Sequence, residues 1–383
     1  METPDPSDTI ETFRIHIDDD VLDDLRSRLA RTRFPDRIDD TGWEYGIPVD
    51  YLRELVEYWR DEYDWRAQET RLNELEQYRT RIDDQSIHFI HARSPHADAQ
   101  PLLMTHGWPG SVVEFVDVIP RLTNPEAFGG NAADAFHVIA PSLPGYGFSE
   151  PPHTRGWDVA RIARAFAELM ARLGYASYGA QGGDWGAQVA TMIGALDPEH
   201  CAAIHLNMPI ADRPDEPVAL SATEKADLTA MAHFQREEAG YAIEQGTKPQ
   251  TLGAALNDSP AGLLAWIVEK FCSWSDCNGH PENTFTRDQL LTNVTVYWVT
   301  QTITSSARLY RETRTSAQAP EYVAVPTGVA RYPKEVLRFP RSWVERRYNV
   351  TYWADMPRGG HFAAMEQPEL FADDVRKFFR TVR

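Results

Sequence analysis

The chain contains 383 residues, of which 42% are hydrophobic and 25% are charged, and its formal net charge is −19 at pH 7. This length exceeds that of one typical hydrophobic core, so we expect two structural units or one core with an insertion. The composition is typical of a soluble globular protein. The negative charge argues against a nucleic-acid or anionic-lipid partner, because phosphate binding requires clustered lysine and arginine residues.

The sequence shows no signal for secretion, membrane insertion or disulfide bonding. Residues 1–13 are acidic and lack the basic and apolar regions of a signal peptide. No stretch approaches the roughly 18–20 apolar residues of a membrane-spanning helix. Cys201, Cys272 and Cys277 follow neither a disulfide framework nor a zinc-binding spacing. We therefore expect a cytoplasmic protein with no metal and no membrane anchor, and a homo-oligomer stays open.

The first 90 residues predict mixed structure. Apolar residues alternate over 12–17, which is typical of a half-buried strand. Residues 18–30 begin with three acids and carry leucines at helical spacing, so they predict a helix, and an amphipathic helix follows Pro48. Residues 77–92 predict a hairpin of two strands about a short polar turn.

From Pro101 onward, predicted strands alternate with predicted helices. The expected strands cover 101–106, 136–142 and 201–209, and the expected helices cover 111–122, 157–174 and 185–196, with residues 175–182 leading into the last of these helices. This alternation predicts an α/β fold with a mainly parallel sheet and helices on both faces.

Residues 210–318 interrupt this alternation, because they are rich in helix formers and have few strand-like runs. Strand-like runs return at 321–326 and 350–356, and an amphipathic helix is expected over 368–379. The predicted organisation is an N-terminal extension (1–90) that packs on core and lid, a core in two parts (91–209 and 319–383), and a helical cap or lid inserted between these parts (210–318).

The stretch QGGDWGAQVA, residues 181–190, carries the strongest local signal. Gly182, Gly183 and Gly186 bracket Asp184 at the start of a predicted helix. This spacing is that of the G-x-S-x-G nucleophile elbow, with aspartate in place of serine. A plain helix cap is the alternative interpretation of Asp184.

Other polar residues follow the predicted strands, at the sheet edge where α/β proteins bind ligands. THGWPGS (105–111) follows one strand, Glu335 follows the penultimate strand and His361 follows the last. The chain order of nucleophile, acid and histidine is that of the α/β-hydrolase elbow family. Asp212 and Asp355 compete with Glu335 for the place of the acid.

Six blocks in order make the chain resemble the epoxide hydrolases of the α/β-hydrolase fold, in their microsomal and juvenile-hormone branch. The resemblance covers nearly the whole chain, including the lead-in RTRFPDRIDDTGWEYG. The blocks are HGWPGSVVEF, LPGYGFSEPP, GGDWG, TKPQTLGAALNDSPAGLLAWIVEKF, VPTG and GGHFAAMEQPE. The membrane-anchor segment of the microsomal relatives is missing, which implies a soluble enzyme.

This resemblance implies a role for each site residue. Asp184 would be the nucleophile that forms a hydroxyalkyl ester, and His361, oriented by Glu335, would activate the water that hydrolyses it. Tyr241 and Tyr310 would donate protons to the epoxide oxygen during ring opening. The product would be a vicinal diol, and the partners would be an epoxide and water without a cofactor or metal. A carboxylate suits the first step because it is ionised at neutral pH and needs no base.

Two aromatic residues complete the expected site. The backbone N–H groups of Trp108 and Trp185 would stabilise the oxyanion formed during ester hydrolysis. Trp108 and Pro109 are also candidates for the substrate pocket, and a cis bond is possible before Pro109. Trp266 and Trp274 are expected in the core of the lid rather than against substrate.

Two other functions stay open at this point. A haloalkane dehalogenase also uses an aspartate nucleophile and a histidine, and Trp185 fits both activities, although the lid tyrosines favour the epoxide. A non-catalytic ligand-binding protein could keep the same fold. Only five of the 38 basic residues are lysines, a bias that suggests a bacterial source. A bacterial epoxide hydrolase would serve natural-product (antibiotic, for example enediyne) biosynthesis or detoxification, and the natural substrate is not readable.

Overall fold

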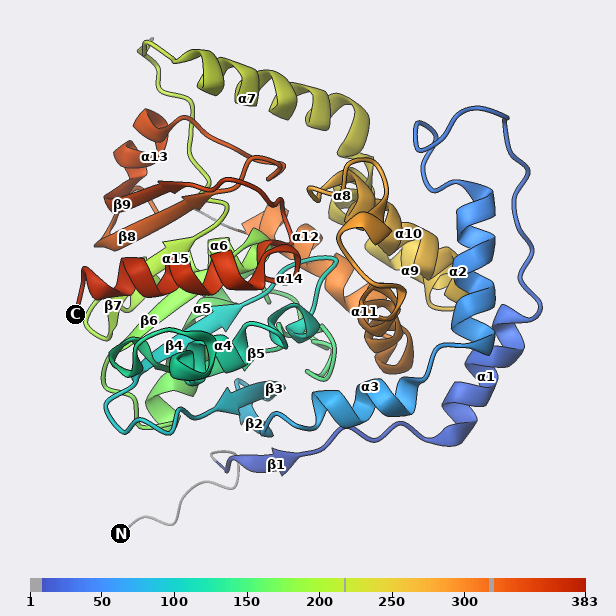
Figure 1. Cartoon of the computed structure of the whole chain (residues 1–383), viewed down its shortest axis with the longest axis horizontal. Coiled ribbons are helices and arrows are strands. Elements are labelled where there is room, and N and C mark those ends of the chain that lie inside the picture. Colours follow the sequence, from blue (N-terminus) through green and yellow to red (C-terminus); the bar gives the residue numbers. More distant parts are fainter. Residues whose placement is uncertain (1–8, 217, 317–319) are drawn as a thin grey trace.

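The computed structural model describes residues 9–216, 218–316 and 320–383. The first eight residues and the predicted boundary between 318 and 319 lie outside the described residues. Figure 1 shows a twisted sheet with helices on both of its faces and a second group of helices beside it.

Within the described residues, the strands form one nine-stranded sheet in the order β1-β2-β3-β5-β4-β6-β7-β8-β9. Strands β4 to β9 pair in parallel, whereas β1, β2 and β3 pair antiparallel and extend one edge. The mainly parallel sheet is therefore confirmed. The strands are β1 (Glu11–Phe13), β2 (Gln77–Ile82), β3 (Gln85–Ala92), β4 (Gln100–Thr105), β5 (Phe136–Pro141), β6 (Tyr178–Gly182), β7 (Cys201–Leu206), β8 (Val323–Arg331) and β9 (Tyr348–Asp355).

Helices cover the sheet on two sides and enclose two hydrophobic clusters. Strand β4 shows why: Leu103 joins one cluster, whereas its neighbours Leu102 and Met104 join the other, because successive side chains of a strand point to opposite faces. The first cluster includes α5 (Val159–Arg172) and α6 (Asp184–Leu196), and the second includes α4 (Ile119–Thr123) and α15 (Pro368–Arg380). Two short helices, α13 (Arg341–Arg347) and α14 (Ala363–Glu366), complete the C-terminal part.

The segment after β7 is helical, as its composition predicts. Its helices are α7 (Ala222–His233), α8 (Gly240–Thr247), α9 (Pro249–Leu256), α10 (Pro260–Ser273), α11 (Arg287–Thr300) and α12 (Ile303–Ser316). Figure 1 shows α8 to α12 gathered beside the sheet, while α7 runs above it toward β8 and β9. Most of α7 is exposed, but Asp227 is buried and pairs with Arg331 and Arg338 from the segment around the end of β8. No helix in the described part of the chain is long and apolar enough to cross a membrane.

The N-terminal helices α1 (Asp19–Leu29), α2 (Val49–Asp61) and α3 (Trp65–Leu72) pack against this helical segment. The Tyr58 hydroxyl donates to Asp288 at 2.9 Å, and the Trp59 indole N–H donates to Thr295 at 3.0 Å. The apolar face of α2 is buried as its periodicity predicts. These contacts tie the start of the chain to the helices beside the sheet.

Two local predictions are wrong. The strand expected over 12–17 ends at Phe13, because the backbone of Ile15 bonds to the side chain of Asn73 instead of continuing a ladder. The helix expected over 111–122 is broken into a 3-10 turn (Val112–Phe115) and α4. Pro120 explains the break, because it has no N–H to continue a helical ladder from the preceding turn.

Candidate active site

Asp184 stands at a sharp turn between β6 and α6. Its φ angle is +50°, a left-handed conformation that is costly for a residue with a side chain. The turn closes tightly because Gly186 has no side chain: a Cβ atom there would lie 1.8 Å from the Thr105 backbone oxygen. The sequence pattern therefore produces the strained elbow that it predicts.

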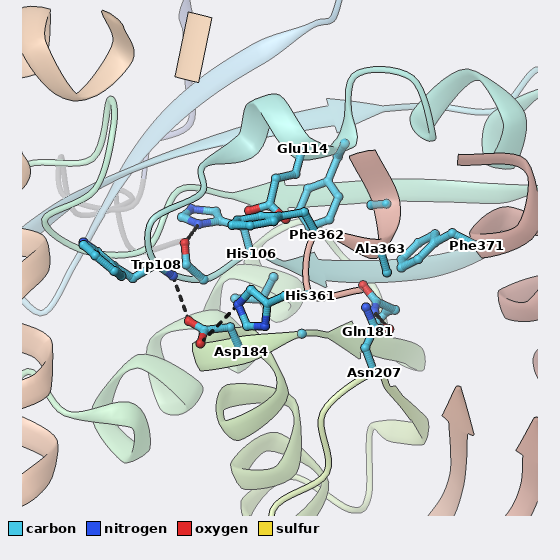
Figure 2. A pocket seen from close by; sticks show the side chains of 15 residues that line it. His106, Trp108, Glu114, Gln181, Asp184, Asn207, His361, Phe362, Ala363 and Phe371 are labelled. Atoms are coloured by element: carbon cyan, nitrogen blue, oxygen red, sulfur yellow. Dashed lines mark hydrogen bonds and ion pairs between the residues drawn. The ribbon is translucent and has the colours of Figure 1, made fainter. Parts of the chain in front are cut away.

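The Asp184 carboxylate does not cap its helix. The capping position of α6 is occupied by Gly183, and Asp184 is the first residue of the helix itself. Instead, one Asp184 oxygen accepts a hydrogen bond from the Trp108 backbone N–H at 2.8 Å, and the other lies 3.6 Å from His361 Nε2. Figure 2 shows the carboxylate facing the imidazole. The helix-cap interpretation of Asp184 is therefore wrong.

Glu335 is the acid that reaches the histidine. His361 Nδ1 lies 2.7 Å from Glu335 Oε1, and Glu335 is only 1% exposed. The competing acids lie elsewhere: the Asp212 side chain is 93% exposed, and the Asp355 side chain is 69% exposed and pairs with Arg331. Three residues from distant parts of the sequence thus form a continuous line from carboxylate to imidazole to carboxylate.

Burial and the charges of these residues shift the pKa values of His361 and Asp184. Burial alone lowers the pKa of His361, but the charge and hydrogen bond of Glu335 and the charge of Asp184 outweigh it and raise this pKa to about 9. Burial raises the pKa of Asp184, while His361 and the backbone amides of Trp185 and Trp108 counteract the rise. The free protein therefore holds a cationic imidazole at neutral pH.

Tyr241 of α8 and Tyr310 of α12 reach the same place from the helical segment. Tyr241 stacks on the Trp108 ring with 5.0 Å between centroids, and Tyr310 meets the Trp185 ring edge-on at 4.7 Å. The centroids of the two phenol rings are 5.9 Å apart. Burial, with the charge of Asp184, raises the pKa of both phenols, so both stay protonated at neutral pH. Among the described residues, the Tyr310 hydroxyl has no hydrogen-bond partner.

Comparison with known proteins identifies the family. The chain matches the model described as "Epoxide hydrolase N terminus" over residues 10–115 and the model described as "alpha/beta hydrolase fold" over residues 100–257. A protein of Stigmatella aurantiaca named "Putative epoxide hydrolase" is 49% identical over 98% of this chain and 86% of its own length. Epoxide hydrolase 1 of Sus scrofa is 39% identical over 97% of this chain and 88% of its own. The crystal structure of juvenile hormone epoxide hydrolase from Bombyx mori has a TM-score of 0.91 at 34% identity, covering 98% of this chain and 95% of that chain.

This chain is an epoxide hydrolase of the α/β-hydrolase fold. The resemblance inferred from the six sequence blocks is confirmed. The matches to these relatives extend over nearly the whole chain, so they include both its N-terminal region and its helical segment.

A small cavity of about 20 Å³ lies next to Asp184 and His361 in the epoxide hydrolase (Figure 2). Trp108 lines it, as do several residues that the sequence patterns do not single out, among them Glu114, Gln181 and Asn207. The expected pocket residue Pro109 does not line this cavity. The bond before it is cis, and its carbonyl oxygen accepts a hydrogen bond from Asn293 at 2.8 Å.

Trp274 lies closer to the site of the epoxide hydrolase than its sequence pattern predicts. Its ring is 1% exposed and lies 4.9 Å from the His361 ring between centroids, and its backbone oxygen accepts a hydrogen bond from the His361 N–H at 2.9 Å. Trp266, by contrast, donates to Gln245 within the helical segment. Helical spacing alone could not separate these two tryptophans, because both lie in or beside α10.

Proposed function

We propose that this epoxide hydrolase opens its substrate with the Asp184 carboxylate and hydrolyses the resulting ester with water activated by His361. The observation that carries the proposal is the line of three residues: Asp184 Oδ2 lies 3.6 Å from His361 Nε2, and His361 Nδ1 lies 2.7 Å from Glu335 Oε1. In this arrangement the imidazole can activate a water that attacks the carboxyl carbon of Asp184 once this carboxylate has been esterified.

The first step forms a bond between an Asp184 oxygen and an epoxide carbon. The epoxide oxygen becomes an alkoxide unless it receives a proton, and Tyr241 and Tyr310 are the groups in place to donate one. Their packing on Trp108 and Trp185, beside the Asp184 carboxylate, supports this role.

The second step is prepared by the first. The negative charge of Asp184 is one cause of the raised pKa of His361, and ester formation removes that charge. The pKa of His361 then falls, so the imidazolium can pass its proton, through solvent, to the phenolate that ring opening leaves, and the neutral imidazole can then act as a base toward water. The backbone N–H groups of Trp108 and Trp185 already interact with the Asp184 carboxylate and would hold the oxyanion, a stabilisation worth about 3 kcal/mol for each donor.

The wider setting is also a proposal. Residues 210–318 would act as a cap that brings the two phenols over the nucleophile, and residues 1–90 would anchor it. The arginine-rich composition supports a bacterial source. The enzyme would then act in the cytoplasm on a small-molecule epoxide, in natural-product biosynthesis or detoxification.

A single turnover in ¹⁸O-labelled water tests the covalent route. With styrene oxide as probe, the label should enter the Asp184 carboxylate and not the diol, and mass spectrometry of the digested protein locates it. Label that appears in the diol first would contradict the ester. Asp184→Asn should form no ester, whereas His361→Gln should accumulate it.

The same preparation separates the alternative functions. A dehalogenase would release halide from a haloalkane faster than it makes diol from styrene oxide. A ligand-binding protein would retain the epoxide unchanged under single-turnover conditions.

A further inference from the structure

Glu114 is a carboxyl group in the interior that the two steps above do not use. It lies in the 3-10 turn between β4 and α4, and its side chain lies against Gly110 in the loop that carries Trp108. A Cβ atom on Gly110 would lie 1.6 Å from Glu114 Oε1, so the loop can accept this carboxyl only because residue 110 is glycine. Glu114 is half-buried and lines the cavity beside Asp184.

The cavity beside Asp184 has the size and polarity of a site for a single water. Its volume of about 20 Å³ exceeds the roughly 10–15 Å³ that one water requires on the same measure. Glu114, Asp184, His361 and Gln181 line it. Gln181 Oε1 is buried without a hydrogen-bond partner in the part of the chain that the structure describes. A cavity with such walls favours a polar occupant.

Ester hydrolysis places a specific demand on the attacking water. A neutral imidazole accepts one hydrogen of this water through Nε2, and the second hydrogen then needs another acceptor. A buried donor without an acceptor costs about 1–3 kcal/mol, and a water that is free to turn loses alignment with the ester carbon. In this cavity, Glu114 offers carboxyl oxygens on a wall shared with His361 and Asp184.

We propose that Glu114 is a positioning residue that holds the hydrolytic water as its second hydrogen-bond acceptor. This inference rests on the proposed ester mechanism. The water donates one hydrogen bond to Glu114 and transfers its other proton to His361 Nε2, while its oxygen bonds to the Asp184 carboxyl carbon. The ester carbon–oxygen bond then breaks, His361 returns the proton to the departing alkoxide, and the diol leaves.

The charges around Glu114 are consistent with this role. Burial raises the pKa of Glu114 to about 8, His361 opposes the rise, Asp184 and Glu366 add to it, and the Ser111 backbone amide opposes it. Either protonation state of the carboxyl keeps an oxygen that accepts a hydrogen bond from water. Charge is therefore not required for the contact.

The test measures the two chemical steps separately with styrene oxide in single turnovers. Glu114→Leu keeps the bulk but removes the acceptor, so ester hydrolysis should slow by about 10- to 100-fold while ester formation stays within about twofold of the wild type. Glu114→Gln keeps an oxygen at the same place and should recover most of the hydrolysis rate. Asp117→Leu is the matched control, because it removes a carboxyl from the same segment that faces Arg71 at the surface, and both steps should stay unchanged.

Three outcomes would overturn the inference: Glu114→Leu hydrolyses the ester at the wild-type rate, it slows both steps equally, or Glu114→Gln loses as much hydrolysis as Glu114→Leu. Thermal unfolding of each variant shows whether the fold has been kept. A wild-type enzyme that forms no ester would refute the proposed mechanism itself, and the two failures are therefore distinguishable.

Discussion

Asp227 and Arg338 form an ion pair that joins helix α7 to the loop of the proposed catalytic acid, with 2.7 Å between Asp227 Oδ1 and Arg338 Nε. The same Arg338 guanidinium donates to the backbone oxygen of Glu335. Arg331, at the end of β8, bonds the second oxygen of Asp227. The helical segment and the loop of Glu335, which contacts His361, are therefore connected through one buried carboxylate.

Asp227→Asn should destabilise the enzyme by about 3 kcal/mol, because it removes the buried carboxylate that Arg331 and Arg338 share and leaves Arg331 with only the exposed Asp355. Asp212→Asn is the control: this exposed residue lies 3.7 Å from Arg347, and its loss should cost less than about 1 kcal/mol. Urea unfolding at neutral pH measures both free energies. Equal losses in the two variants would contradict the prediction.

Replacement of the phenols should affect ring opening and leave ester hydrolysis unchanged. Tyr241→Phe and Tyr310→Phe should each slow ester formation by about 10-fold or more, and the double variant should lose about 10²- to 10⁴-fold. Stopped-flow measurement of the tryptophan signal gives the rate of this step. Tyr175→Phe, which removes only a hydroxyl bonded to the remote His91, should behave as the wild type.

The stability of the enzyme should fall as the pH rises past neutrality. The pKa of an unfolded histidine is about 6.5, whereas Glu335 and Asp184, against the effect of burial, raise that of His361 to about 9 in the folded protein. A raised pKa stabilises the fold fully below about pH 6.5, and this stabilisation is lost as the pH passes through about 9. Unfolding free energies between these pH values should decline more steeply in the wild type than in His361→Gln. Parallel curves would contradict the shifted pKa.

The elbow provides a prediction about packing. Gly186→Ala would place a methyl group 1.8 Å from the Thr105 oxygen, so it should cost about 3 kcal/mol or more. At Gly183 the nearest atom to an added Cβ is Asn207 Nδ2 at 3.2 Å, and φ is −120°. Gly183→Ala should therefore change the unfolding free energy by less than about 1 kcal/mol. A similar cost at both positions would show that the close approach at Gly186 is not decisive.

Sequence patterns could predict the parts of this molecule that depend on local rules. Strand and helix alternation predicts the parallel sheet, and glycine spacing predicts the elbow at Asp184, because both reflect backbone geometry within a short window. The loop positions of Glu335 and His361 follow from where strands end. The exact ends of the strands and helices could not be predicted: the first strand ends because Ile15 bonds to Asn73, which lies 58 residues away in the chain.

The residues around the cavity could not be predicted, because tertiary packing alone brings them together. Glu114 lies in a block that resembles the family, but no spacing distinguishes it from a surface glutamate. Gln181 has the pattern of an ordinary strand residue, and only the fold places it in the wall of the cavity that Asp184 and His361 also line. The contact between Trp274 and His361 could not be predicted either, because a buried residue at this end of α10 can face the core of the helical segment or the site.

The two phenols come from the helical segment, whereas the proposed nucleophile, the histidine and the acid beside it all come from the loops of the sheet. If ring opening depends on both parts and ester cleavage on the second alone, evolution can reshape the helices around new epoxides without rebuilding the hydrolytic half. Libraries confined to α8 and α12 should therefore change which epoxides react and at which carbon, while every variant that forms the ester still releases it at a similar rate.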